Sequence, residues 1–158
     1  MAIMLSLTLI IGIIEKNIPF DYVVPGVKLG LSNAVILIAI YIFNFPTSFL
    51  LVILKCTTLA LVTGNFSSFI YSISGSVLSF LVMWLIIKLT KDRLSPVGIS
   101  VIGAVFHNLG QITAAAFMLG TINVAAYLPV LTIAGVITGI IVGFTVKYSL
   151  KGLSQFLS

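Results

Sequence analysis

Three polar side chains that could bind a ligand or transfer a proton fall within five residues of an apolar stretch. The stretch is VFHNLGQITAAAF, residues 105–117, and the polar residues are His107, Asn108 and Gln111. In a helix, His107 and Gln111 share a face because they are four residues apart, whereas Asn108 is turned by about 100°. An imidazole and two carboxamides so placed can line a pocket, or they can hydrogen-bond to neighbouring helices. The sequence leaves both interpretations open.

Lys55 lies in a still more apolar setting, FLLVILKCTTLALV. It follows Pro46 by nine residues, which places it about 13 Å along a helix that begins there. A charged group at that depth in a membrane is costly, usually faces the bundle interior and is a candidate for function. The alternative is a lysine whose long stem reaches the headgroups. We favour a functional lysine that offers its charge to an anionic group.

The composition identifies the setting of these residues. The chain has 158 residues, of which 60% are hydrophobic and 7% charged, and its mean hydropathy is +1.30. Soluble domains carry about 25% charged residues. The sequence therefore predicts a multi-pass protein of the cell membrane, in direct contact with the lipid bilayer. Because each span needs roughly 20 apolar residues, we expect a single all-α domain over residues 1–158, a bundle of six transmembrane helices.

Six apolar runs can be recognised along the chain. The predicted helices cover residues 1–18, 31–43, 46–63, 66–89, 96–119 and 127–148, and the first two runs are short. Positive charges cluster between the fourth and fifth runs and after the sixth, and the residues are Lys88, Lys91, Arg93, Lys147 and Lys151. The positive-inside rule places these segments, and with six spans both termini, in the cytoplasm.

The outer connections supply further candidate ligand contacts. Residues 15–30 form the longest one, with two prolines and most of the acids of the chain, and a long connection without helical pattern is often functional. It contains Lys28, a second cation for an anionic group, and Asn33 follows at the start of the second helix. Asn65 lies in the short turn at 64–66, where it is a candidate ligand contact or a simple turn residue.

Small residues predict where helices pack closely. Gly135, Gly139 and Gly143 recur every four residues in the sixth run, a spacing that allows close backbone approach. Ala2 and Ser6 make a weaker version of the same pattern in the first run. These residues predict helix packing rather than chemistry.

Several kinds of chemistry lack their motifs in this sequence. It has no P-loop for ATP and no Cys/His cluster for a metal. The three acids, Glu15, Asp21 and Asp92, are far apart, which argues against a carboxylate-dependent active site. Apart from Lys55, the basic residues flank apolar runs, as membrane topology requires, and they do not indicate nucleic acid. We therefore expect no enzyme activity from this chain alone, no metal site and no intrinsic cofactor.

Three segments carry a family resemblance: IPFDYVVPGVKLGLSN, LKCTTLALVTGNF and GAVFHNLGQITAA. Together they resemble the Gx transporter family, also described as heptaprenyl diphosphate synthase component I. The resemblance covers about residues 14–150 and is clearest at 25–33 and 107–111. That family is similar in pattern to the substrate-binding S components of energy-coupling-factor vitamin transporters.

The resemblance implies a binding subunit that takes a small lipophilic or vitamin-like ligand from the outer side. The pocket candidates are then Lys28, Asn33, Lys55, Asn65, His107, Asn108 and Gln111. Separate membrane and ATPase subunits would couple transport, and Ala2 and Ser6 would face the coupling subunit.

Two alternatives come with the family. One is a membrane subunit of a flavin-linked extracellular electron transfer system, with an extracytoplasmic redox partner and a bound quinone. The other is an accessory subunit in polyprenyl diphosphate synthesis, with a bound isoprenoid. Prenyl transferases hold magnesium diphosphate with DDxxD motifs, and the two aspartates of this chain cannot form one.

Overall fold

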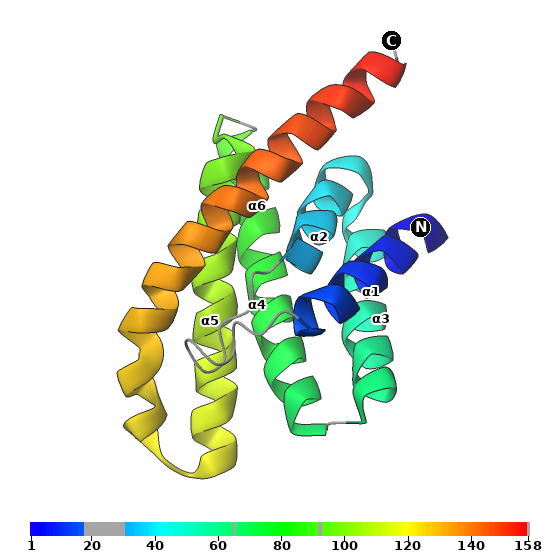
Figure 1. Cartoon of the computed structure of the whole chain (residues 1–158). Helices are drawn as coiled ribbons and strands as arrows, with labels where there is room; N and C mark the ends of the chain where they lie inside the picture. The colour runs from blue at the N-terminus through cyan, green and yellow to red at the C-terminus, as the bar shows by residue number, and fades with distance from the viewer. Residues whose placement is uncertain (18–30, 65, 92, 158) are drawn as a thin grey trace.

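The computed structural model describes residues 1–17, 31–64, 66–91 and 93–157, and all regular structure in this part is helical. Figure 1 shows the helices in chain order. They are α1 (Ala2–Asn17), α2 (Leu31–Ile42), α3 (Phe45–Thr63), α4 (Phe66–Thr90), α5 (Pro96–Leu119), the 3-10 helix η2 (Ile122–Tyr127) and α6 (Leu128–Leu157).

Four of these helices are long and apolar enough to cross a membrane. The four candidate spans are Phe45–Val62, Phe69–Thr90, Pro96–Leu119 and Ile122–Leu153. By their length, α1 and α2 extend only about 24 Å and 18 Å, less than the ~30 Å hydrocarbon core of a bilayer. The prediction of an all-α membrane protein is confirmed. Six complete spans and the placement of the termini stay predictions.

Local chemistry explains where the long helices begin and end. The side chains of Asn44 and Ser95 each accept a hydrogen bond from a backbone N–H in the first turn of α3 and α5, respectively. A proline follows each of these caps, at a position where no helical N–H is needed. At the other end, Gly64 and Gly120 both have φ of 63°, the left-handed conformation that favours glycine.

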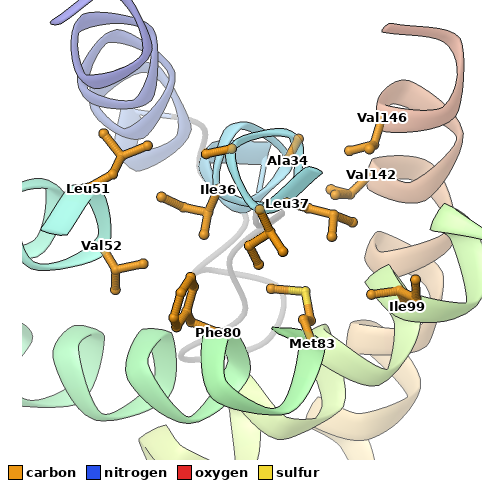
Figure 2. Packing of buried hydrophobic residues seen from close by; sticks show 12 residues of the cluster. Ala34, Ile36, Leu37, Leu51, Val52, Phe80, Met83, Ile99, Val142 and Val146 are labelled. Atoms are coloured by element: carbon orange, nitrogen blue, oxygen red, sulfur yellow. The ribbon is translucent and has the colours of Figure 1, made fainter. Parts of the chain in front are cut away.

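The short helix α2 lies at the centre of the bundle. It contacts α1, α3, α4 and α6, and Figure 2 shows side chains from α3, α4, α5 and α6 gathered around it. Ala39 and Leu37 of α2 are essentially inaccessible. A helix that is hydrophobic all round belongs in such a position. The buried hydrophobic core is therefore built around α2, with Phe80 and Met83 of α4 beneath it.

Basic side chains gather at one end of the molecule. The α4–α5 connection and the C-terminal end of α6 lie at the same end in Figure 1, and Lys88, Lys91, Arg93, Lys147 and Lys151 are all exposed there. This arrangement is consistent with the cytoplasmic side predicted for them. The sixth helix runs to Leu157, past the predicted end at residue 148, because the turns after the apolar run contain no proline, and the one glycine there, Gly152, is tolerated inside the helix.

Candidate ligand-binding site

A small cavity lies between α2, α4, α5 and α6. Its volume is about 30 Å³, which is room for about two water molecules. Six polar side chains line it: Asn33, Ser79, Ser100, His107, Asn108 and Thr138. The remaining lining is apolar or glycine, including Leu37 and Met83. A chamber inside a membrane bundle with several polar side chains in its wall is a natural place for a ligand contact or for ordered water.

Lys55 and Asn33, both predicted as site residues, are hydrogen-bonded to each other. The Lys55 Nζ donates to the Asn33 Oδ1 over 2.7 Å. Lys55 is 3% exposed, so its side chain is buried in the bundle and does not extend to the membrane surface. Asn33 also lines the cavity. Lys55 is therefore connected to the cavity wall through its hydrogen bond to Asn33.

The three polar residues of α5 have different surroundings. His107 and Asn108 line the cavity. Asn108 also ties α5 to α6, because its Nδ2 donates to the Leu131 carbonyl over 2.6 Å. Gln111 does not line the cavity and packs instead on α4, where a Cβ added to Gly75 would lie 2.8 Å from the Gln111 Cγ. His107 therefore shares the cavity wall with Asn108, although it shares a helical face with Gln111.

Glycines bring α5 close to both of its neighbours. On the α6 side, a Cβ added to Gly139 would lie 2.8 Å from the Val101 Cα, and Gly135 and Gly143 also lie against α5. On the α4 side, a Cβ added to Gly110 would lie 2.9 Å from the Gly75 Cα. The small-residue ridge of the sixth run thus packs within the chain, and it holds the cavity walls in place.

Three hydroxyl-bearing residues of the cavity were missed by sequence reasoning: Ser79, Ser100 and Thr138. Ser79 donates to the Gly103 carbonyl over 2.8 Å, and Thr138 to the Gly135 carbonyl over 3.2 Å. Hydroxyls in membrane helices commonly bond to backbone carbonyls in this way. The available signal was the serine-rich start of the fourth run, whose positions 72, 76 and 79 follow one helical face.

The remaining predicted residues lie away from the cavity or outside the described part. Ala2 and Ser6 are exposed on α1, where a partner could contact them. Lys28 and Asn65 lie outside the described residues. Within the described chain, no group of three or more His, Cys, Asp or Glu side chains is arranged to hold a metal ion. The described groups around the cavity offer a positive charge, amides, hydroxyls and one imidazole.

The family assignment agrees with the residues that suggested it. The sequence model of heptaprenyl diphosphate synthase component I matches residues 4–150. The chain belongs to this family. For this family member the match runs from α1 into α6 and includes every residue that lines the cavity. Comparison with curated proteins and with solved structures gives no match.

Proposed function

We propose that the chain is a membrane-embedded binding subunit, of the S-component type, that captures a small lipophilic or vitamin-like ligand from the outer side. The observation that carries this proposal is the cavity lined by Asn33, His107 and Asn108, with Lys55 buried behind it. These side chains come from α2, α3 and α5, three elements that are separate in the sequence.

The energetic cost of this arrangement supports a ligand role. A charge buried in a membrane bundle is rare, and it is usually kept where a substrate, an ion or a proton needs it. Hydrogen bonds between membrane helices contribute only about 0.6 kcal/mol on average. Helix association alone is therefore a weak reason to retain a lysine beside Asn33 in this interior. Asn108 donates one hydrogen bond to the Leu131 carbonyl, which joins α5 to α6. It also lines the cavity, where it can contact a ligand.

The cavity is smaller than the site that a vitamin-sized ligand needs. A site for a vitamin-sized molecule usually encloses about 300 to 1,000 Å³, whereas the cavity holds about 30 Å³. Ligand entry therefore requires the helices around α2 to separate. A second hollow, of about 350 Å³, lies near the α3–α4 turn. Its walls include Leu61 and Phe66, which are 79% and 72% exposed, so it suits lipid contact better than selective binding.

Native mass spectrometry of gently purified protein, with extraction of small molecules, tests the proposal. We expect one stoichiometric ligand that is lost in His107→Ala, while the thermal stability of the ligand-free variant stays close to that of wild type. Thr113→Val is the matched control, because Thr113 is exposed on the same helix and its hydroxyl bonds to the Leu109 carbonyl of that helix. The absence of any stoichiometric ligand, or equal retention in both variants, would contradict the proposal.

The family description favours a second candidate, an accessory membrane subunit of a prenyl diphosphate synthase. The words "component I" imply another component, and a chain with only Asp21 and Asp92 needs a partner to supply the aspartate-rich magnesium site. Adding this chain to a soluble prenyl transferase component should then change its rate or product length. An unchanged product would exclude this candidate, and a bound quinone in the mass spectra would favour the electron-transfer alternative instead.

A further inference from the structure

The residue that follows α4 has an uncommon backbone conformation for its type. Gly64 and Gly120, directly after α3 and α5, have φ of 63°. Lys91, directly after α4, has φ of 48°. Residues with a side chain rarely adopt this left-handed conformation, and glycine is the usual residue at such a position. At the end of α4, a basic side chain therefore occupies a position where the backbone favours glycine.

Lys91 lines a hollow beside the α4–α5 connection. The volume of the hollow is about 420 Å³, within the range of roughly 300 to 1,000 Å³ that is usual for small-molecule sites. Its lining consists of Leu89, Thr90, Lys91, Arg93 and Leu94. Asp92 lies outside the described residues, and none of the five lining residues is acidic. The hollow therefore combines two cations with two leucines.

The hollow lies at the boundary of the membrane. The candidate span of α4 ends at Thr90, and that of α5 begins at Pro96. Leu89 is 71% exposed at the end of its span, where acyl chains can contact it. Lys91 and Arg93 are exposed in the polar connection just beyond. A molecule in the hollow would therefore meet apolar side chains toward the membrane and positive charge toward the water.

This arrangement is complementary to an anionic phospholipid, whose phosphate lies above its acyl chains. A lysine and an arginine can contact the same phosphate, and the planar guanidinium can bind two of its oxygens. Basic segments beside a membrane helix are attracted to anionic lipid head groups. An acidic segment of a soluble partner would also match the two cations, but it would have no use for an exposed leucine at the end of a span.

We propose that this hollow binds one anionic phospholipid, with Lys91 and Arg93 on the phosphate and Leu89 against an acyl chain. No residue that lines the hollow also lines the cavity between α2, α4, α5 and α6. The lipid site is therefore a second site, and it does not depend on the proposed capture of a ligand in the cavity.

Titration of the full chain in neutral detergent, followed by native mass spectrometry, tests the site. We expect one phosphatidylglycerol to bind in preference to phosphatidylcholine. The double variant Lys91→Gln/Arg93→Gln should weaken its affinity about thirtyfold, since each basic residue near an anionic lipid contributes about fivefold.

The matched control is Lys88→Gln/Lys147→Gln, which removes the same charge at the same end of the molecule but outside the hollow. It should leave the affinity nearly unchanged, because salt screens exposed charges that do not contact the lipid. Equal weakening by the two double variants would reduce the effect to general surface charge and would overturn the proposal. Equal binding of the two lipids by the wild type would also overturn it.

Lys91→Gly separates lipid binding from the backbone conformation. Without added lipid, its melting temperature should equal or exceed that of wild type, because glycine adopts a positive φ without strain. Its affinity for phosphatidylglycerol should nevertheless fall. A variant that melts at a lower temperature and binds the lipid normally would make Lys91 a structural residue and refute its role in the site.

The acyl-chain contact distinguishes a lipid from a free anion. Leu89→Asn should weaken the binding of phosphatidylglycerol, and inorganic phosphate at the same concentration should not displace the lipid. Leu61→Asn is the control, because Leu61 is 79% exposed near the end of the α3 span and lies outside the hollow. Displacement by phosphate, with normal binding in Leu89→Asn, would indicate an anion site and refute the lipid site. Displacement by a polyglutamate peptide at lower concentration than by phosphatidylglycerol itself would assign the hollow to an acidic protein partner instead.

The two sites can fail separately. His107→Ala should retain the phospholipid, and Lys91→Gly should retain any ligand of the cavity. Loss of the phospholipid in His107→Ala would contradict a separate site at the α4–α5 connection.

Discussion

Two layers of the same bundle are built from opposite kinds of side chain. Near the basic end, Phe45, Phe49, Phe80 and Trp84 of α3 and α4 form an aromatic layer, with ring centroids 4.8 to 5.8 Å apart. Farther along the helices, the polar layer consists of Lys55 and the residues that line the cavity. Large rings fill the first layer. Glycines, hydroxyls and amides leave the second with an internal space.

The two layers achieve close helix packing in different ways. In lipid there is no hydrophobic gain from joining apolar helices, so the layers depend on van der Waals contact and hydrogen bonds. The aromatic layer obtains this contact from large side chains, and the polar layer obtains it from close backbone approach at Gly139. The aromatic layer should therefore be sensitive to lost volume, and the polar layer to added volume.

The largest effect is expected from adding volume to the polar layer. Gly139→Leu would place a side chain against the Val101 backbone, because a Cβ there lies only 2.8 Å from the Val101 Cα. Separating α5 from α6 should cost about 3 kcal/mol of unfolding free energy and abolish ligand binding. SDS titration of protein in mixed micelles measures the loss. Ile141→Leu, on an exposed position of the same helix, should change nothing, and equal stability of the two variants would refute close packing at Gly139.

Removing volume from the aromatic layer should have a smaller effect. Phe80 is inaccessible, and its ring lies tilted against the rings of Phe45 and Phe49. Phe80→Ala should cost roughly 2 kcal/mol, less than the ~3–5 kcal/mol typical of soluble cores, because in lipid only the cavity contribution remains. The ligand should still bind the folded variant. Leu85→Ala, whose site is 49% exposed, is the control, and a loss of affinity in Phe80→Ala would argue against separate roles for the layers.

Much of the fold follows from local signals in the sequence. The apolar content indicates a membrane, and long continuous apolar runs in a membrane form helices, because a helix satisfies its own backbone groups where no water is present. Asn44 with Pro46, and Ser95 with Pro96, mark the starts of α3 and α5 by capping chemistry that depends on neighbouring residues alone. These features could be predicted because the residues that determine them lie within one turn of each other.

The site depends on contacts that no local pattern contains. Lys55 and Asn33 were each recognisable as unusual, but their bond joins residues 22 positions apart on different helices. The central position of α2 could not be predicted from the sequence either. A short helix that is apolar on all sides shows no preferred face for packing. Ser79 and Ser100 resemble any serine in a membrane helix, where the hydroxyl can bond to the backbone. Only the packing of four helices shows that they share a cavity.

The smallest effect is expected at Asn108, which has two roles. It lines the cavity of the polar layer, and its hydrogen bond to the Leu131 carbonyl joins α5 to α6. Asn108→Ala removes one hydrogen bond between helices, and such bonds average about 0.6 kcal/mol. The Leu131 carbonyl lies within α6, where the helix also uses it as an acceptor, so no buried group is left without a partner. We therefore expect a small loss of unfolding free energy and a clear loss of ligand affinity in parallel titrations. A loss above about 2 kcal/mol with unchanged affinity would make Asn108 a structural tie and would leave Asn33, Lys55 and His107 as the binding groups.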